Sequence, residues 1–411
     1  MPAHTCCRVC DTALPAPFLD LGEMALANAF LSSPEEFAAE PRYPLATAGC
    51  PRCGLVQLTY VVPAEQLYRQ YVYVSSTSEA VRQYAGELAA RIVERERLGP
   101  SSLVVELGSN DGLVLLAFQQ RGVTVLGVEP ARNIAEIARG RGVPTVNEFF
   151  TGSTAAALAK EHGPARVILG RHVFAHLDDW HDFFSGVDAW LAPGGALLIE
   201  VPYFRTLVDQ LEFDTIYHEH LSYVAAQPMA MLCERHGFRL IDAEPVALHG
   251  GSLLLVMQRA AGTTRPTARL EALLAEERQG RLLHPDTLAV FAQRVGRWKQ
   301  EFEACVERLE RSGAKLVGYG AAAKANTLLN YCPAAAKRLA CLLDRSPHKQ
   351  GRYTPGTHLP VVSPEAWNAD GTTHMVILAW NFKDEIMRQM RSFAERGGRF
   401  VVPIPTPEVV S

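Results

Sequence analysis

Residues able to carry or hold a proton crowd one short segment near the middle of the chain: Tyr217, His218, Glu219 and His220. In an extended backbone, alternate side chains share a face, which would place Tyr217 with Glu219 and His218 with His220. Such a polar run is costly in a core unless each group finds a partner. It follows a strand-like apolar run at 196–201. We interpret the segment as the seat of acid–base chemistry, and the alternative is a polar loop that caps the fold.

Two Cys-x-x-Cys pairs near the N-terminus are typical of a metal site: Cys7 with Cys10, and Cys50 with Cys53. Each pair can turn two thiolates toward one ion, and two pairs complete a tetrahedral site. Cys6 competes with Cys7, but its spacing from Cys10 is less usual. The alternative, four free buried thiols, does not explain the pairing. We therefore predict a zinc-ribbon-like fold around a structural Zn²⁺ with no open position for catalysis.

The 411 residues have an ordinary globular composition, with 48% hydrophobic and 20% charged residues. This length predicts two or three domains. A net charge of −4 argues against a general nucleic-acid binder. No apolar run is long enough to cross a bilayer, and the first residues do not resemble a signal peptide. We expect a cytoplasmic protein that binds neither nucleic acid nor membrane. Its oligomeric state is open, with a monomer as the expectation.

Strand-like and helical patterns alternate over the middle of the chain. The expected strands are 103–107, 124–129, 166–169 and 196–201. Strands separated by helices favour a parallel sheet, that is, an α/β fold. Two later apolar runs, 239–243 and 253–258, are expected to add an antiparallel pair at its edge.

A glycine turn follows the first of these strands. Gly108 permits a tight turn and a close ligand, but Asn110 stands where a dinucleotide motif needs a second glycine. Glu129 ends the next strand and can accept both hydroxyls of a ribose. A nucleoside without phosphate fits this turn best, and the cationic sulfonium of S-adenosylmethionine suits the acidic Glu106 and Asp111. The alternative is a purely structural turn.

Further candidate cofactor contacts follow the later strands: Asn110, Pro130, Phe149, Phe150 and His172. An aromatic ring at 149 or 150 could rest against an adenine. His172 follows the strand at 166–169, at the edge where open α/β sheets bind ligands. His176 lies one helical turn beyond His172, and we do not predict a metal there because no third ligand is near in the sequence.

The C-terminal part repeats the strand and helix pattern on a smaller scale. Its expected strands are 315–320, 338–343, 375–379 and 399–402. Two amphipathic helices at 269–283 and 288–309 are expected to connect it to the middle, each with a charged face in solvent.

This part also carries a second glycine motif, Gly-x-Gly-x-x-Ala at 318–323, with Asp344 at the end of the next strand. Alone, the motif indicates a nicotinamide dehydrogenase. We favour the diphosphate of a substrate as its ligand, or a degenerate turn that binds nothing. Candidate substrate contacts are Lys324, Asn326, Lys349, Arg352 and, beside two glycines, His249.

Over nearly its whole length the chain resembles the S-adenosylmethionine-dependent C-methyltransferases of nucleotide-linked 4-keto-deoxysugars. The resemblance rests on the two cysteine pairs and on the segments 26–31, 73–78, 106–112, 213–220, 249–252, 324–331 and 344–352. It implies a zinc-binding domain, a Rossmann-like class I methyltransferase core and a smaller Rossmann-like α/β domain that helps to hold the nucleotide sugar. The expected boundaries are 1–75, 76–262 and 312–411, with a helical connector at 263–311.

The resemblance also implies a reaction. A methyl group would pass from S-adenosylmethionine to a carbon next to the C4 ketone of a nucleotide-diphosphate 4-keto-sugar, with dTDP as the expected nucleotide. C3 is the first choice of carbon and C5 the second. Such reactions belong to deoxysugar biosynthesis, including that of antibiotics. One departure from the family pattern is His172, where relatives often carry Asn.

By the same resemblance, His220 is the base that removes the proton from that carbon, and histidine suits neutral pH. Tyr217 and Tyr73 would hold the C4 oxygen as charge develops. Glu219 would orient a partner or bind a sugar hydroxyl, and His176 is the alternative base. Two other functions remain: an O- or N-methyltransferase for another small molecule, and a zinc-containing binding protein with an inactive methyltransferase domain.

Overall fold

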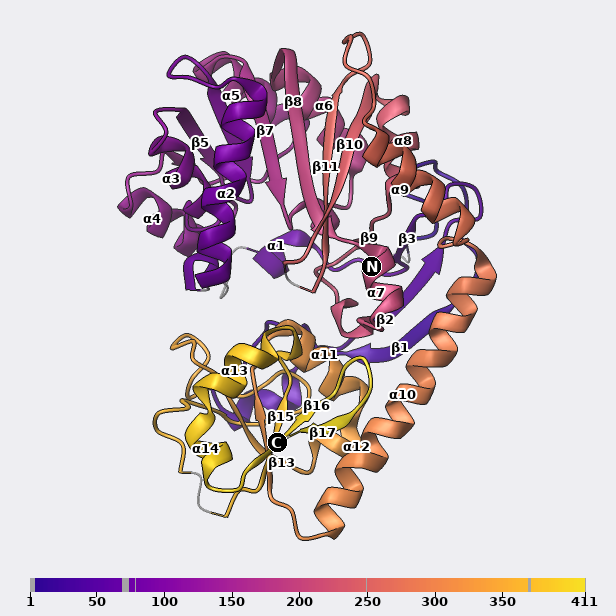
Figure 1. The fold of residues 1–411 in the computed structure, drawn as a ribbon, viewed down its shortest axis with the longest axis vertical. Helices are drawn as coiled ribbons and strands as arrows, with labels where there is room; N and C mark the ends of the chain where they lie inside the picture. Colours follow the sequence, from indigo (N-terminus) through magenta and orange to yellow (C-terminus); the bar gives the residue numbers. More distant parts are fainter. Residues whose placement is uncertain (1–3, 69–73, 78, 249, 369–370, 411) are drawn as a thin grey trace.

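The computed structural model describes residues 4–68, 74–77, 79–248, 250–368 and 371–410. Figure 1 shows two lobes, one built on the middle of the chain and one on its C-terminal part. The long helix α10 (Pro285–Arg311) runs along one side of both lobes, and the N-terminal strands β1 (Leu19–Met24) and β2 (Tyr43–Gly49) lie between them. Within the described ranges no helix is long and apolar enough to span a membrane.

A seven-stranded sheet forms the core of the first lobe. In spatial order its strands are β10 (Phe238–Val246), β11 (Ser252–Arg259), β8 (Leu191–Pro202), β7 (Ala165–Arg171), β4 (Leu103–Leu107), β5 (Thr124–Val128) and β6 (Thr145–Val146). The last five are parallel, and β10 and β11 add an antiparallel pair at one edge. The α/β fold and this edge pair were both predicted by the apolar pattern.

Strand β8 begins earlier than the sequence pattern predicts. Its first residue, Leu191, pairs with Ala165, whereas Ala196 pairs with Val167, so the register breaks between the two pairs. Pro193 and two glycines occupy the break. Such residues usually mark a turn, and here they form an irregularity within a strand that continues on both sides.

Helices cover both faces of this sheet. They are α2 (Glu79–Glu96), α3 (Leu113–Gln119), α4 (Arg132–Gly140), α5 (Gly152–His162), α6 (Trp180–Trp190), α7 (Phe204–Asp209) and α8 (Ala226–Arg235), with short 3₁₀ turns η2 (Ser75–Thr77), η3 (Phe174–His176) and η4 (Phe213–Thr215). On β4, Val105 packs into the core cluster that holds Phe174, and Val104 packs into the cluster on the opposite face that holds Phe118. The strands read as continuous apolar runs because both faces are covered.

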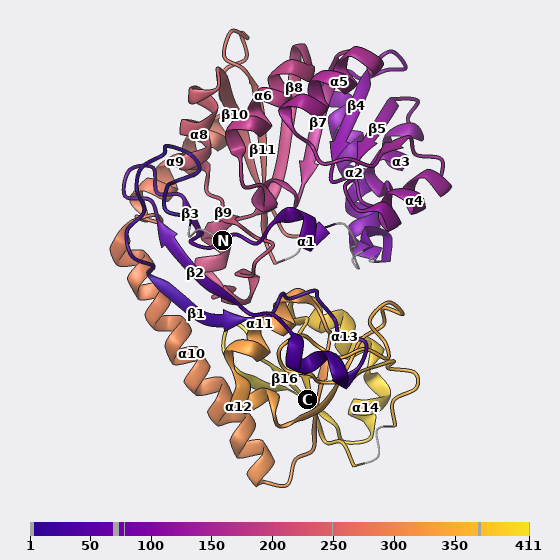
Figure 2. The same ribbon diagram turned by 180° about the vertical axis from the view of Figure 1, so that it is seen from behind.

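The N-terminal part forms a small antiparallel sheet, whose fourth strand comes from the middle of the chain. Its order is β1, β2, β3 (Val56–Leu58) and β9 (Ser222–Tyr223), and β9 comes directly after the acid–base segment. Between β1 and β2, the chain passes through the 3₁₀ turn η1 (Pro34–Ala39), which Figure 2 shows against the C-terminal lobe. There the ring of Phe37 stacks on His358 at a centroid distance of 3.9 Å. Helix α1 (Ala64–Tyr68) follows β3.

The C-terminal lobe is a six-stranded sheet with its own helices. The strand order is β14 (Val361–Val362), β13 (Leu339–Leu343), β12 (Leu316–Tyr319), β15 (His374–Ile377), β16 (Arg399–Val402) and β17 (Glu408–Val410). All neighbours are parallel except β17. The helical elements are α11 (Ala323–Tyr331), α12 (Pro333–Ala336), η5 (Trp380–Phe382), α13 (Lys383–Gln389) and α14 (Arg391–Glu395).

The two predicted connecting helices are present as α9 (Ala268–Gln279) and α10. Helix α10 starts three residues before its predicted start because His284 caps it and Pro285 occupies its first turn. It also packs into the core: Trp298 is buried, its ring lies 4.7 Å from that of Phe213, and its indole donates to the carbonyl of Pro403. Trp298 of helix α10 therefore joins Phe213 of the first lobe to Pro403 of the second, by a ring contact and a hydrogen bond.

Candidate active site

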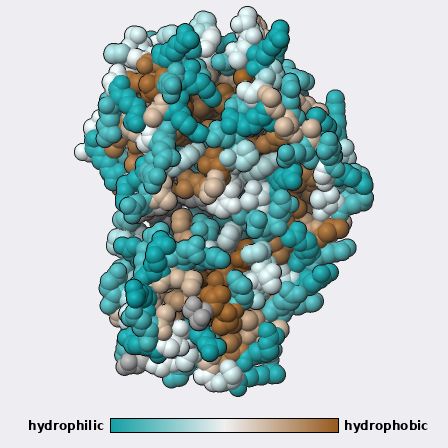
Figure 3. Space-filling model, viewed as in Figure 1, coloured by the Kyte–Doolittle hydropathy of each residue, from teal (hydrophilic) through white to brown (hydrophobic). Residues whose placement is uncertain are grey.

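A cavity of about 370 Å³ lies where the three parts of the chain meet. We call it the interdomain cavity. Figure 3 shows the surface hollowed between the two lobes. The sequence-predicted residues on its wall are Glu106, Gly108, Asn110, Glu129, Pro130, Phe149, Phe150, His172, His176, Tyr217, His220, Lys324 and Lys349. Candidate cofactor, catalytic and substrate residues, which are far apart in the sequence, thus share one enclosed space.

Two predicted site residues, Tyr73 and His249, lie outside the described residues. Four others are described but do not line the cavity: Asp111, Glu219, Asn326 and Arg352. Arg352 is exposed. The amide of Asn326 donates to the carbonyl of Ala27 at 2.7 Å, which ties helix α11 to the N-terminal part.

The two predicted carboxylates away from the cavity wall, Asp111 and Glu219, accept hydrogen bonds from other residues of the chain. Asp111 is fully buried, and its Oδ2 accepts from Arg141 at 2.5 Å and from the backbone N–H of Ser76 at 3.2 Å. Glu219 accepts from the amide of Asn28 at 2.6 Å, and Asn28 does line the cavity. In the structure described here, Asp111 therefore holds the loop around Ser76, and Glu219 positions Asn28.

His220 is held in one protonation state by its neighbours. Its Nδ1 lies 2.9 Å from the carbonyl oxygen of Thr215, and its Nε2 lies 2.9 Å from the hydroxyl of Tyr217. Because a carbonyl only accepts, Nδ1 carries the hydrogen of the neutral ring, and Tyr217 then donates to Nε2. Burial, with His176 nearby, lowers the pKa of His220 well below its ordinary value. His220 therefore presents an unprotonated Nε2 at neutral pH.

His176 lies beside this pair. Its ring centroid is 5.1 Å from that of His220, and Tyr68 stacks on it at 5.4 Å. Burial lowers the pKa of His176 to about 3, and no described residue partners its Nε2. The hydroxyl of Tyr68 donates to the carbonyl of Glu219 at 3.0 Å. Tyr68 thus joins helix α1 to His176 and to the backbone of Glu219, which precedes His220.

The loops after β4 and β5 form the opposite wall. Gly108 has a positive φ of 59°, and a side chain there would meet Val173 at 2.9 Å, so glycine is required. Both oxygens of Glu129 accept from backbone N–H groups, those of Asn110 and Ala131. Glu106 has one carboxylate oxygen without a partner among the described residues. Burial raises the pKa of Glu106 to about 8.

A buried ion pair supports this wall. Arg171 donates to Glu200 at 2.9 Å, and Nε2 of His172 lies 3.3 Å from the other Glu200 oxygen. Tyr84 also donates to Glu200, at 3.1 Å. Burial opposes ionisation, but Arg171 and His172 hold the pKa of Glu200 below its ordinary value. His172 lines the cavity with a positive φ of 53°, a backbone conformation that is uncommon for any residue other than glycine.

Polar groups from the C-terminal lobe complete the cavity. Nζ of Lys324 lies 3.6 Å from Glu212 and 4.7 Å from the ring centroid of Trp380. The indole of Trp380 donates to Asp214 at 2.7 Å. Burial raises the pKa of Glu212 to about 7 and that of Asp214 to about 6. These contacts join the two lobes at the cavity, and none follows from a local motif.

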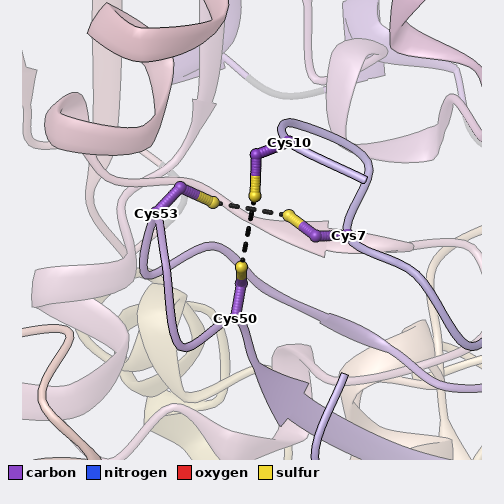
Figure 4. Close-up of side chains that lie close together, drawn as sticks. All are labelled: Cys7, Cys10, Cys50 and Cys53. Atoms are coloured by element: carbon purple, nitrogen blue, oxygen red, sulfur yellow. Dashed lines mark hydrogen bonds between the residues drawn. The ribbon is translucent and has the colours of Figure 1, made fainter. Parts of the chain in front are cut away.

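The four predicted cysteines converge as expected. The Sγ atoms of Cys7 and Cys53 are 3.4 Å apart, as are those of Cys10 and Cys50 (Figure 4). All four sulfur atoms lie within 4.8 Å of one another, and all four residues are buried. Four sulfurs around one Zn²⁺ at about 2.3 Å are separated by just under 4 Å, so the donor set fits a tetrahedral ion.

Comparison with known proteins assigns the whole chain. Family models match a zinc binding domain at residues 7–68, a methyltransferase domain at 79–243 and a C-methyltransferase C-terminal domain at 247–405. The C-methyltransferase NovU of Streptomyces niveus is 37% identical over 405 residues, covering 98% of this chain and 96% of NovU. The chain belongs to this family of C-methyltransferases. It is an S-adenosylmethionine-dependent methyltransferase with a four-cysteine zinc site.

Solved methyltransferases align with less than half of this C-methyltransferase. The magnesium protoporphyrin IX methyltransferase of Synechocystis PCC 6803, solved with bound S-adenosylmethionine, is 14% identical with a TM-score of 0.34, over 43% of this chain and 79% of that one. The glycopeptide N-methyltransferase MtfA is 16% identical with a TM-score of 0.35, over 43% of this chain and 96% of that one.

The geometry of Glu106 predicts that cofactor binding releases a proton. With a pKa of about 8, Glu106 is mostly protonated at pH 7. A cationic cofactor beside it would favour the carboxylate, so affinity should rise by up to about tenfold between pH 6.5 and 8. Calorimetry in buffers of different ionisation enthalpy would measure the released proton. In Glu106→Gln, both the release and the pH dependence should disappear, and their persistence would assign them to another group.

Several wall residues escaped sequence analysis. Asn28 lies in the 26–31 segment that supports the family resemblance. The resemblance marked this segment as characteristic of the family, but it gave Asn28 no function. Tyr68 also lines the wall, and nothing in its local sequence points to His176, on which its ring stacks. Glu212 precedes the acid–base segment, but only the fold brings it to Lys324. These residues reach the cavity wall through contacts between distant parts of the chain, and the spacing of residues in the sequence does not reveal such contacts.

Proposed function

We propose that this C-methyltransferase acts on a nucleotide-linked 4-keto-deoxysugar and adds the methyl group next to the C4 ketone. The proposed nucleotide is dTDP, and the proposed carbon is C3, with C5 as the second choice. The observation that carries the proposal is the Tyr217–His220 pair on the cavity wall, with an unprotonated imidazole nitrogen facing a phenol.

The pair suits carbon rather than oxygen or nitrogen as the methyl acceptor. A carbon atom is not a nucleophile until a proton leaves it, and a carbon next to a ketone is acidic enough for a positioned base. Nε2 of His220 would take that proton. The buried ring disfavours its own charged form, and the enolate that forms beside it would offset this cost. An amine or hydroxyl acceptor already carries a lone pair that can attack the methyl group, so its methylation involves no enolate.

Tyr217 would act at the same moment. Its hydroxyl now donates to His220, so a bound sugar has to replace that hydrogen bond. Breaking it exposes the lone pair on Nε2 and frees the phenol to donate to the C4 oxygen. A donor placed where negative charge develops lowers the barrier. We assign the same donor role to Tyr73 and keep His176 as the alternative base.

The cofactor would occupy the wall formed by the loops after β4 and β5. S-adenosylmethionine supplies a methyl group on a sulfonium cation, which a carbanion can attack in line. The cofactor could approach the backbone at Gly108 closely because no side chain stands there, and we assign its ribose to Glu129. Glu106 would face the sulfonium with a carboxylate oxygen that no described residue partners. Phe149, Phe150 and Arg171 line the remainder of this wall, and Arg171 is held in place by its ion pair with Glu200.

The nucleotide would bind toward the C-terminal lobe. Ala322 and Ala323, at the N-terminus of helix α11, line the cavity with no side chain capping the helix. Free N–H groups at a helix start favour a phosphate. Lys324 and Lys349 line the same region and add positive charge. Lys349 now donates to the carbonyl of Ala321 at 2.9 Å, so it would exchange that contact for the diphosphate.

A panel of dTDP-linked and other nucleotide-linked 4-keto sugars, each incubated with S-adenosylmethionine carrying a ¹³C-methyl group, tests this function. We expect a mass gain of one methyl with a 4-keto sugar and a new carbon–carbon bond at C3 or C5 by NMR. The same sugars reduced to 4-hydroxy compounds are the control and should not react. Methyl transfer to oxygen or nitrogen, or equal reaction of the reduced sugars, would contradict the proposal.

A further inference from the structure

The first zinc knuckle carries an arginine that reaches the acid–base site. Arg8 stands between Cys7 and Cys10, and its side chain is only 1% exposed. A buried guanidinium is costly unless its N–H groups are partnered. A zinc knuckle needs its thiolates and a tight turn, and neither requires an arginine at this position. The contacts of Arg8 therefore call for an explanation beyond the zinc site.

Arg8 holds two segments of the methyltransferase part at once. Its Nε and one terminal nitrogen donate to Oδ1 of Asp178, at 3.2 and 2.8 Å. Its other terminal nitrogen donates to the carbonyl oxygen of Leu221 at 3.3 Å. The planar guanidinium offers donors in several fixed directions, so it can bridge two acceptors where a lysine would hold one.

Each acceptor lies next to a histidine of the site. Asp178 is two residues beyond His176, and Leu221 directly follows His220. The backbone N–H of Leu221 also donates to the carbonyl of Ala175 at 2.8 Å, so the two histidine loops are already joined at one point. Arg8 adds a second connection on the far side of the same residues. Two connections fix both the separation and the relative rotation of the loops.

The first zinc knuckle is also hydrogen-bonded to strand β3, which pairs with strand β9 just after His220. The backbone N–H of Arg8 donates to Gln57 at 2.9 Å, and Gln57 donates to the carbonyl of Cys6 at 3.0 Å. Gln57 pairs with Ser222 in the β3–β9 ladder, two residues after His220. The zinc site, Arg8, and the loops of His176 and His220 are thus connected by polar contacts, all of which centre on the buried Arg8 side chain or on Gln57.

We propose that Arg8 is a positioning residue for C-methylation, which holds the loops of His176 and His220 at the spacing that proton abstraction needs. The four-cysteine zinc site fixes Arg8 and so acts on the chemistry through it. This inference rests on the proposed function, in which His220 is the base. Misplacing a reacting group by about 1 Å can cost about a hundredfold in rate.

The test compares Arg8→Lys with Arg235→Lys in the full-length zinc-loaded protein. Arg235 is the matched control because it also joins the first knuckle to the methyltransferase part, through the carbonyl of Val9 and through Asp11 at 2.8 Å, but away from the histidines. Four quantities are measured: bound zinc, S-adenosylmethionine affinity, kcat, and exchange of the substrate carbon's hydrogen in D₂O without cofactor.

For Arg8→Lys we expect kcat and the exchange rate to fall together by about tenfold to a hundredfold, with zinc and cofactor affinity unchanged. Arg235→Lys should keep both rates within about twofold. Asp178→Asn, which removes one acceptor charge and preserves the shape, should lower the exchange rate by several-fold and covers the case in which Arg8→Lys does not fold.

Three outcomes would overturn the inference: unchanged exchange in both Arg8→Lys and Asp178→Asn, loss of zinc from Arg8→Lys, or an equal loss of exchange in Arg235→Lys. Wild-type protein and His220→Asn run in the same assay. If wild-type protein turns over no 4-keto sugar, the proposed function fails instead. If His220→Asn keeps exchange, the assignment of His220 as the base fails, and with it the basis of this inference.

Discussion

Replacing His220 with asparagine is expected to stop hydrogen exchange at the substrate carbon and to lower methyl transfer by about 10²–10⁴-fold, the usual contribution of a positioned general base. An amide cannot accept the proton that Nε2 would take. S-adenosylmethionine affinity should be unchanged, because the residues assigned to the cofactor lie at or after the ends of strands β4 to β7, outside the segment that holds His220. Exchange is followed by NMR in D₂O, and affinity by calorimetry.

His218→Asn is the matched control for this prediction. It changes the same residue type two positions away, but Nε2 of His218 lies 3.2 Å from the carbonyl of Tyr43 and the residue does not line the cavity. It should lower thermal stability and leave exchange within about threefold, as expected for loss of one buried hydrogen bond. If His220→Asn keeps exchange, the base is His176 or Tyr217.

Replacing one zinc ligand should have the largest effect on stability. Cys7→Ser removes a thiolate from a closed four-sulfur site, and structural zinc sites contribute about 10–16 kcal/mol of binding free energy that is coupled to folding. We expect loss of bound zinc, a large fall in the melting temperature of the N-terminal part and poor solubility. Metal analysis and calorimetric melting measure these changes.

Cys6→Ser is the control for Cys7→Ser. It tests whether the loss of stability comes from losing a zinc ligand or from losing any thiol in this segment. Cys6 is exposed and does not belong to the four-sulfur group, although it adjoins Cys7. The variant should retain a full equivalent of zinc and melt within about 2 °C of the wild type, as expected for a surface change of no more than about 0.5 kcal/mol. Zinc loss from Cys6→Ser, or zinc retention in Cys7→Ser, would show that the ligand set is different.

Features of the fold that depend on residues close together in the chain could be predicted from the sequence. The apolar runs that became β4, β5, β7 and β8 are continuous because helices cover both sheet faces, and the cysteine spacing reflects the geometry of a single ion. The glycine turn after β4 was also predicted in its place. Periodicity and spacing report such features directly, since each depends on residues close together in the chain.

Partners that are distant in the chain could not be predicted. Nothing near Asp111 in the sequence indicates its ion pair with Arg141 at the end of helix α4. The hydrogen bond from Asn326 to the carbonyl of Ala27 likewise has no local signal. Arg8 received no role of its own, because nothing near it in the sequence points to Asp178 or Leu221. Each of these contacts spans 30 or more residues of chain.

A crystal structure with S-adenosylhomocysteine and a dTDP-4-keto sugar would test the central claim most directly, through the distance from Nε2 of His220 to the sugar carbon beside the ketone. We predict that this distance is about 3–3.5 Å, with the Tyr217 hydroxyl turned to the C4 oxygen and the vacant methyl position on the opposite face of that carbon. An imidazole more than about 6 Å away, or a different side chain facing that carbon, would contradict the account, because contact distance is required for proton transfer.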